Sequence, residues 1–298
     1  MICDQTAQIV VAGTHVGYRI GEFDVSVSSE IDTVLTDFAA LYEGYPSGEG
    51  SEGRALSVGV RRVGNGAWRR ERYEIVGDGE AIGHERRRAE VIPFLEWGIN
   101  WCLISTRAEF LQLHAATMAR DGIGVVLAAG SGGGKSTLVA GLVARGWTYL
   151  SDEFALLCPE TLDAHAFPKA ICIKAGAFGI VRELGLRFVG KRYYVKGLKG
   201  RVGYVNPREV DPHRIGDRTR IRLVLFPKYT PGRKPTVSRI SRASAAFALA
   251  SSALNRNAFR DQGVSVLSRV VRSAECFSID SGSLEGACDR IDSLVDGL

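Results

Sequence analysis

A glycine-rich stretch from Ala129 to Thr137 contains residue types that bind phosphate groups. Its sequence, AGSGGGKST, lets closely spaced backbone N–H groups approach phosphate oxygens, because glycine has no side chain and adopts positive φ angles readily. We expect Lys135 to bind the β- and γ-phosphates and the Ser136 hydroxyl to ligate Mg²⁺. The alternative is a glycine-rich turn that binds no ligand. The residues predicted to bind a nucleotide are Gly130, Ser131, Gly132, Gly133, Gly134, Lys135, Ser136 and Thr137.

Two adjacent carboxylates, Asp152 and Glu153, begin seventeen positions after Lys135. The interval has room for one helix, Lys135 to Arg145, and one strand, Trp147 to Ser151. We therefore expect the acidic pair to lie beside the loop, where carboxylates can contact a metal ion or a substrate hydroxyl. The alternative is a solvated turn. The absence of an N-K-x-D motif and of an L-S-G-G-Q motif argues against GTPases and transport ATPases.

His114 precedes the glycine-rich loop in the sequence and lies in the first of two β-rich runs, 111–118 and 123–129. Asp121-Gly122 lies between these runs and predicts a hairpin turn that joins them. If these strands pair, His114 lies toward the sheet end that carries the glycine loop. The alternative is a hydrogen-bonded core histidine, which is common among apolar neighbours.

The elements around the loop fit the geometry that phosphate binding requires. An apolar strand, VVLAA, enters the loop, and a helix with the apolar stripe Leu138, Leu142 and Val143 leaves it and ends at Gly146. The positive end of that helix would face the phosphates. The sequence therefore predicts a strand, a phosphate-binding loop and a helix in this order.

The N-terminal part alternates strands and turns. We expect strands in QIVVA, YRIGEFDVSV, ALSVGVRRV and WRRERYEIV, with a hairpin at Gly64-Asn65-Gly66. A helix from Glu30 to Tyr42 would be capped by Ser29. A mostly apolar helix from Glu90 to Ala108 would join the two halves, with Trp97 and Trp101 as core anchors or, alternatively, as an aromatic platform for a ligand.

The C-terminal part is less regular. Arg187 to Val205 is basic and rich in glycine, so we expect a mobile loop whose role is left open. IRLVLFPKY is predicted as a buried strand and CFSID as another. Helices are predicted from Ser244 to Asn255 and from Ser283 to Leu294.

Composition is that of a globular chain, with 45% hydrophobic and 24% charged residues in 298. The net charge of +5 favours anionic ligands, but the run Arg86 to Arg88 has no interleaved aromatic residues, so nucleic acid is not the expected partner. Six cysteines without a C-x-x-C pair are expected to be reduced. With no signal peptide and no apolar stretch of membrane length, we expect no membrane partner and a cytoplasmic location.

These motifs, in this order and spacing, resemble those of the HPr kinase/phosphorylase family, and most closely its bacterial offshoot, the HPr-kinase-related kinase A group. The resemblance implies an α/β fold: a P-loop kinase domain of the HPr kinase and phosphoenolpyruvate carboxykinase type over residues 89–298, with the connecting helix, and a small N-terminal α+β domain over 1–88. The matching segments are FLEWGINW (94–101), LHAA (113–116), GKST (134–137), RGWTYLSDE (145–153), Lys174, Lys199-Gly200 and FPKY (226–229).

The family resemblance implies transfer of the γ-phosphate of ATP, with Mg²⁺, to a serine hydroxyl of a small protein or peptide. By the same resemblance, Asp152 is the general base, His114 the active-site histidine, and Glu153 a metal ligand where the family has a second aspartate. Glutamate is longer by one methylene, so it can reach the ion directly or through water. With Ser136, the predicted metal ligands are thus Glu153 and Asp152.

One departure concerns the acceptor, because the glycine-rich stretch with which true HPr kinases contact their substrate is not found here. The resemblance to genes beside ribosomal peptide pathways suggests a peptide serine instead. Lys174, Lys196 and Lys199 are candidates for phosphate or acceptor contacts, with surface lysines as the alternative. Two other functions remain open: a nucleotide-binding regulatory or scaffold protein without transfer, and a kinase for a small metabolite. The sequence leaves open homo-oligomer formation and a reverse phosphorylase reaction.

Overall fold

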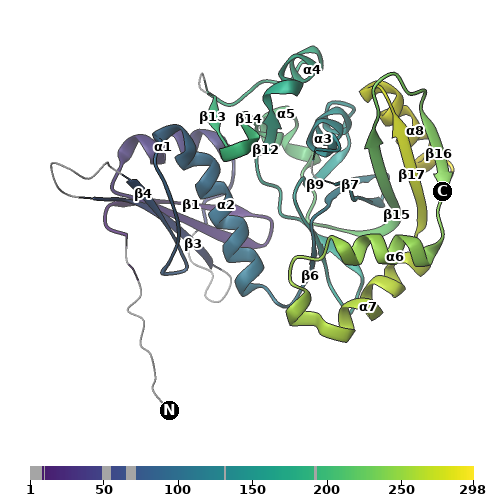
Figure 1. Cartoon of the computed structure of the whole chain (residues 1–298), viewed down its shortest axis with the longest axis horizontal. Helices are drawn as coiled ribbons and strands as arrows, with labels where there is room; N and C mark the ends of the chain where they lie inside the picture. Colours follow the sequence, from purple (N-terminus) through teal and green to yellow (C-terminus); the bar gives the residue numbers. More distant parts are fainter. Residues whose placement is uncertain (1–8, 10, 49–54, 65–71, 131, 191–192) are drawn as a thin grey trace.

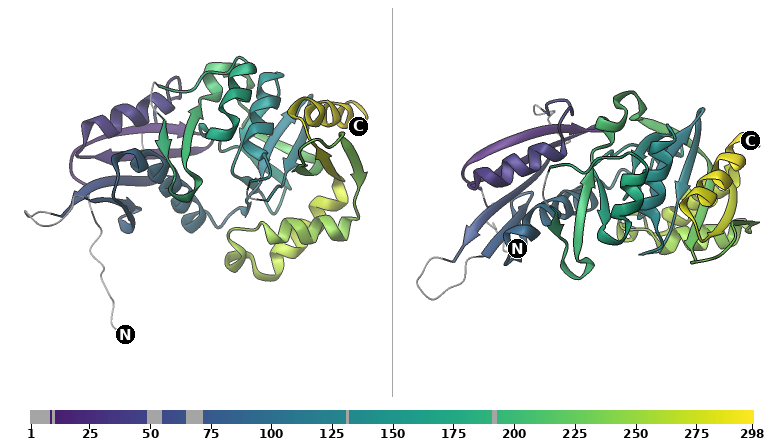
Figure 2. Two further views of the ribbon diagram at one scale, coloured as in Figure 1. Left: turned by 45° about the horizontal axis from the view of Figure 1, so that its top comes forward. Right: turned by 90° about the horizontal axis from the view of Figure 1, so that it is seen from above.

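The computed structural model describes residues 9, 11–48, 55–64, 72–130, 132–190 and 193–298. The described strands form a five-stranded sheet near the N-terminus, a nine-stranded sheet and a three-stranded sheet. Figure 2 shows the N-terminal sheet at one end of the molecule and the C-terminal helix at the other. The predicted mixed α/β architecture is confirmed. No described helix is long and apolar enough to cross a membrane.

The N-terminal sheet has the order β1-β2-β3-β4-β5, in which β2 and β3 are parallel and the other pairs antiparallel. Two helices cover it, and α2 packs against β3, β4 and β5 (Figure 1). The elements are β1 (Thr14–Ile20), β2 (Phe23–Ser29), α1 (Asp32–Leu41), β3 (Ala55–Val63), β4 (Arg72–Gly77), β5 (Glu80–Glu85) and α2 (Arg88–Thr106).

Two predictions for this part change in detail, and a third is confirmed as far as the described residues reach. The stretch YRIGEFDVSV is not one strand but a hairpin, because Gly21 at φ +63° turns the chain back on itself. Helix α1 begins at Asp32, and Ser29 accepts a hydrogen bond from the backbone N–H of Ile31 instead of capping the first turn. β3 and β4 pair antiparallel as expected, whereas Asn65 lies outside the described residues.

The nine-stranded sheet is built around β15, which is parallel to β8 on one edge and to β17 on the other. β7 pairs antiparallel with both β8 and β9, and the β7–β8 turn is the predicted Asp121-Gly122. Its strands are β6 (Leu111–Leu113), β7 (Ala116–Arg120), β8 (Ile123–Leu127), β9 (Thr148–Ser151), β10 (Ala155–Leu157), β11 (Asp163–His165), β15 (Arg218–Tyr229), β16 (Thr236–Arg239) and β17 (Glu275–Ser281).

Helices cover both faces of this sheet, since successive strand residues point to opposite sides. Val125 and Leu127 pack with α3 and α8, whereas Val126 packs with α6 and α7 (Figure 1). Helix α7 follows α6 after a short break and was missed by the sequence reasoning, which expected one helix ending at Asn255. The helices are α3 (Lys135–Ala144), α6 (Arg242–Ser251), α7 (Arg256–Ser273) and α8 (Leu284–Asp296).

The predicted mobile loop, Arg187 to Val205, is instead largely ordered structure. It contributes β13 (Tyr194–Val195), the 3₁₀ turn η2 (Gly197–Lys199) and β14 (Arg201–Val205). These elements form the three-stranded sheet with β12 (Ile171–Lys174), in the order β12-β14-β13. The remaining described elements are η1 (Ala175–Ala177), α4 (Phe178–Glu183), α5 (Pro207–Val210) and η3 (Pro212–Arg214).

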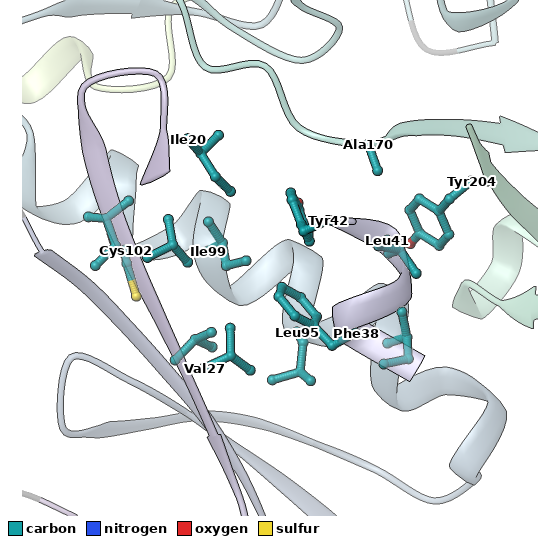
Figure 3. Packing of buried hydrophobic residues seen from close by; sticks show 14 of the residues in the cluster. Ile20, Val27, Phe38, Leu41, Tyr42, Leu95, Ile99, Cys102, Ala170 and Tyr204 are labelled. Atoms are coloured by element: carbon teal, nitrogen blue, oxygen red, sulfur yellow. The ribbon is translucent and has the colours of Figure 1, made fainter. Parts of the chain in front are cut away.

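The core of the N-terminal part continues across residue 88. Figure 3 shows Phe38 of α1, and Tyr42 just after that helix, packed near Leu95 and Ile99 of α2, with Tyr204 of β14 nearby. The division into domains 1–88 and 89–298 therefore stays a prediction. The prediction that Trp97 is a core anchor is wrong: its side chain is 37% exposed and stacks on Phe94 at the surface. Trp101, by contrast, is partly buried against this core.

Candidate active site

The glycine-rich stretch lies between β8 and α3, as predicted. Gly132 and Gly134 have φ angles of +88° and +83°, which place both in the left-handed region that favours glycine. The N–H of Gly133 donates to the carbonyl oxygen of Gly130 at 3.0 Å and closes the turn. Ser131 lies outside the described residues. The chain thus has the strand, loop and helix that the phosphate-binding prediction requires.

A cavity of about 230 Å³ opens beside this loop. Its lining includes predicted site residues from five separate segments of the chain. They are His114, Gly130, Gly132, Gly134, Lys135, Ser136, Thr137, Asp152, Glu153, Lys174, Lys196 and Lys199. The fold therefore brings together residues that are up to 85 positions apart in the sequence.

Lys135 places a buried cation in this cavity. Its Nζ is buried and has no hydrogen-bond partner among the described residues. Burial lowers the pKa of Lys135, and the charges of Asp152 and Glu153 oppose that shift. A buried ammonium without a partner is costly, so this group suits an anionic ligand.

Asp152 lies at the end of β9 and is only 4% exposed. Its Oδ2 accepts a hydrogen bond from the Ser136 hydroxyl at 2.8 Å, whereas its Oδ1 is buried and has no partner in the described chain. Burial raises the pKa of Asp152, while the charge of Lys135 opposes the increase. One carboxylate oxygen thus faces the loop serine and the other is available to a ligand.

Glu153 is held by three side chains that come from different elements. Its Oε2 accepts a hydrogen bond from the Asn100 amide of α2 and lies 4.0 Å from Lys169 Nζ. Its Oε1 lies 3.8 Å from Lys196 Nζ. Burial would raise the pKa of Glu153, but Lys196, Lys169 and the amide outweigh burial and lower the pKa to about 2. Glu153 is therefore charged at neutral pH.

His114 occupies the position expected from the hairpin. The β7–β8 pairing ends at Ala116 and Leu127, so His114 stands at the sheet end where the glycine loop begins. Its backbone N–H donates to the carbonyl oxygen of Ser252 at 2.8 Å, and its side chain lines the cavity. Burial and the nearby charge of Lys135 lower the pKa of His114.

The three candidate lysines all reach the cavity. Lys174 ends β12, and Lys196 and Lys199 flank the turn between β13 and β14. Burial would lower the pKa of Lys196, but Cys172 and Glu153 outweigh burial and raise it. The segment that was expected to be a mobile loop therefore supplies two cations to the site.

Asn100 and Lys169 are site residues that the sequence reasoning missed. A signal for Asn100 was present, because Glu96 and Asn100 are the two polar residues in an otherwise apolar stretch and lie one helical turn apart. Lys169 comes from an irregular segment before β12 and had no such signal. Its place in the site depends on tertiary packing alone.

Magnesium fits the donor set on the loop side of the cavity. In the described part of the chain, no group of three or more His, Cys, Asp or Glu side chains could hold a metal ion. Mg²⁺ is usually bound through one or two carboxylates together with phosphates and water, so it does not need such a group. The Ser136 hydroxyl and the Asp152 carboxylate are oxygen donors of the kind it prefers.

A second, more apolar cavity of about 230 Å³ adjoins the first on the far side of the loop. Gly134, Thr137, Gly176 and Ala177 line both cavities, so the two are neighbours. The wall of the second also contains Gly133, Leu138, Ile180, Pro227, Lys228, Tyr229, Ile279, Ser281, Ser283, Leu284 and Ala287.

A protein-family model described as SynChlorMet cassette protein ScmC matches residues 94–183. That range includes Asn100, His114, the glycine loop and the acidic pair but not Lys196 or Lys199. No curated protein matches the sequence. Among solved structures, the HPr(Ser) kinase/phosphatase from Coxiella burnetii matches with 14% sequence identity, over 62% of this chain and 94% of that one, with a TM-score of 0.32.

The HPr kinases, whose motifs this sequence resembles, are thus represented among the solved structures to which the chain is similar.

Proposed function

We propose that this chain is an ATP- and Mg²⁺-dependent kinase that transfers the γ-phosphate to a serine hydroxyl of a small protein or peptide. The observation that carries the proposal is that two buried groups in this cavity, Lys135 Nζ and Asp152 Oδ1, have no hydrogen-bond partner among the residues that the structure describes. A cation and a carboxylate oxygen at these places match the two needs of phosphoryl transfer, which are charge neutralisation and positioning of the nucleophile.

Each residue then has a distinct role. Lys135 and the loop amides bind the β- and γ-phosphates. Ser136, with Asp152 Oδ2 beside it, holds Mg²⁺, which when bound neutralises charge on the phosphates. Asp152 Oδ1 accepts the proton of the acceptor hydroxyl. Glu153, which is charged at neutral pH, would contact the same metal ion directly or through water.

The apolar second cavity is the proposed site of the adenine base. It adjoins the phosphate cavity through Gly134 and Thr137, as the base and phosphates of one nucleotide require. Tyr229 is 55% exposed beside it and offers an aromatic face to a planar ring.

Lys174, Lys196 and Lys199 are proposed to surround the transferred phosphoryl group and the acceptor. Cations placed where negative charge accumulates stabilise the transition state of phosphoryl transfer. The choice of a peptide serine as the acceptor is supported by the resemblance of the motifs to the HPr kinase/phosphorylase family.

The test is transfer of label from γ-labelled ATP to the peptides encoded beside this gene, with Mg²⁺ and with EDTA. Asp152→Asn keeps an acceptor for Ser136 but removes the base, so we expect transfer to fall at least about 100-fold. ADP binding without Mg²⁺ should be retained. Asp217→Asn, at an exposed position, is the matched control. Unchanged transfer by Asp152→Asn would refute the role of Asp152.

Two outcomes would favour the other functions. Tight ATP binding by the wild-type chain without transfer to any peptide would favour a regulatory or scaffold protein. ATP turnover that depends on a small acid or amino acid would favour a metabolite kinase. Lys135→Met should weaken ATP binding in every case, with Lys234→Met at an exposed position as the control.

A further inference from the structure

Helix α2 carries two polar side chains into an otherwise apolar environment. Glu96 is 3% exposed, and Asn100 follows it one turn later on the same face. Around them, Leu95 and Ile99 belong to the core that joins α1, α2 and β14 (Figure 3). Buried polar groups of this kind need partners, so their contacts define what they do.

Lys169 is the shared partner of both side chains and is itself only 5% exposed. Its Nζ contacts Glu96 Oε2 at 2.9 Å, the backbone oxygen of Glu96 at 2.8 Å and Asn100 Oδ1 at 2.7 Å. A lysine ammonium has three protons, and each of these acceptors can receive one. The cation is therefore fully satisfied without a ligand.

This arrangement determines which way the Asn100 amide points. Lysine can only donate, so the Asn100 oxygen must face Lys169 and its NH₂ group must face away from Lys169. The NH₂ group then donates to Glu153 Oε2. Lys169 thus sets the orientation of Asn100, and Asn100 in turn holds one oxygen of Glu153.

The opposite end of this network lies in the N-terminal part. Tyr42 at the end of α1 donates from its hydroxyl to Glu96 Oε1 at 2.7 Å, and Tyr42 has no exposed surface. The network therefore runs from α1 through Glu96 and Lys169 to the acidic pair beside the glycine loop.

We propose that Asn100 and Lys169 are positioning residues that orient the Glu153 carboxylate toward bound Mg²⁺-nucleotide, so that helix α2 is part of the active site. This inference rests on the proposed function, because it assigns Glu153 a role in binding the metal-nucleotide complex. Neither residue is proposed to touch the reacting atoms. Asn100 acts through Glu153, and Lys169 acts both through Asn100 and through its own charge 4.0 Å from Glu153 Oε2.

The consequence is measurable in the absence of transfer. Asn100→Ala leaves Glu153 Oε2 without its donor, so we expect the affinity for ADP with Mg²⁺ to fall about 10-fold, as is typical when a partner of a metal-binding side chain is lost. Affinity for ADP in EDTA should not change. Asn100→Asp, which keeps the size of the side chain and an acceptor for Lys169, should cause a larger loss, because it places two carboxylates together.

The experiment is calorimetric titration of ADP, with and without Mg²⁺, into the full chain and its variants. The set is wild type, Asn100→Ala, Asn100→Asp, Glu153→Gln and the double variant Asn100→Ala with Glu153→Gln. If Asn100 acts through Glu153, the double variant binds as weakly as Glu153→Gln alone. Independent, additive losses would overturn the inference.

Asn206→Ala is the matched control for a purely structural effect. Asn206 is a buried asparagine whose side chain donates to the backbone oxygen of Glu43 at 2.9 Å, and it likewise joins the N-terminal part to the rest. The Asn206→Ala substitution should lower the unfolding midpoint without changing the Mg²⁺ dependence of ADP affinity. Equal Mg²⁺-specific losses in Asn206→Ala and Asn100→Ala would overturn the positioning role. No ADP binding by the folded wild type would instead refute the proposed function.

Discussion

At the scale of single residues, the site is defined by how its charges are compensated. Lys169 has three acceptors, whereas Lys135 Nζ has no partner in the described chain. Both are buried, yet only Lys135 retains the capacity to bind an anion. Both residues are lysines, so the residue type does not distinguish them. The number of acceptors around each ammonium separates the structural cation, Lys169, from the ligand-binding one, Lys135.

Tyr229 provides a test of the proposed base site. Tyr229→Ala removes the aromatic wall, so we expect ATP affinity to fall about 10-fold, since ring stacking contributes roughly 1 kcal/mol or more. Tyr229→Phe should bind normally. The measurement is competition between ATP and inorganic triphosphate, because triphosphate binding should be unaffected. Equal weakening for both ligands would contradict the assignment.

Asp292 of α8 offers a pH-dependent test of stability. It accepts hydrogen bonds from Arg145 at 2.7 Å, from Arg120 at 2.8 Å and from the Trp147 indole at 2.9 Å. Burial would raise the pKa of Asp292, but the bonds from Arg145 and Trp147 outweigh burial and lower the pKa below 3.8. The folded state therefore favours the charged form of Asp292. The stabilisation of the fold by this carboxylate is present above the ordinary pKa of an aspartate and is lost as pH falls below that pKa.

Asp292→Asn should accordingly reduce the free energy of unfolding by about 1 kcal/mol at neutral pH, after allowance for partial solvent exposure. The difference from wild type should shrink as pH falls below the ordinary pKa of an aspartate. Urea unfolding followed by far-ultraviolet circular dichroism measures both. A difference that persists unchanged at low pH would show that charge is not its cause.

At the scale of elements, the spacing of residues along the sequence was sufficient to predict a structure where one short segment contains the whole motif. The strand, loop and helix around Lys135 follow from glycine placement and apolar periodicity, and the β7–β8 turn follows from Asp121-Gly122. Failures occurred where tertiary packing decided the outcome. The basic segment became β13 and β14 because β12 pairs with β14, a partner that no local pattern reveals.

Gly134 tests the geometry of the loop itself. Its φ is +83° and an added Cβ would meet nothing closer than Tyr229 at 3.6 Å, so Gly134→Ala introduces backbone strain without a clash. We expect a loss of about 1 kcal/mol in unfolding free energy. Gly176→Ala is the control, because Gly176 lines the same cavity with open space and ordinary φ. Equal stability of the two variants would contradict the conformation of the loop.

At the scale of the whole molecule, the sequence suggested two domains. In the structure, however, side chains from both parts pack in one hydrophobic core. Tyr45 of the N-terminal part donates from its hydroxyl to the backbone oxygen of Pro168 at 2.5 Å, and Tyr204 packs in the same cluster. The polar network through Glu96 adds a second connection. The sequence pattern could not show this, because neither contact is local.

We therefore expect one cooperative unfolding transition. Variants that keep only Trp101, near the N-terminal sheet, or only Trp147, in the second sheet, should report the same thermal midpoint. Far-ultraviolet circular dichroism of each variant provides the control for altered stability. Two separated midpoints would show that the core around the N-terminal sheet and α2 and the core around α3 and α8 unfold independently.

Strand β15 has a consequence for how the molecule opens locally. Its residues Leu223 to Leu225 are paired on both edges and covered by helices on both faces. Their amide hydrogens should exchange with solvent only when the entire chain unfolds. Pro227 and Tyr229, at the end of the same strand, line the apolar cavity. A nucleotide base bound there would contact the end of this protected strand, whereas the lysines of the β13–β14 turn line the neighbouring phosphate cavity.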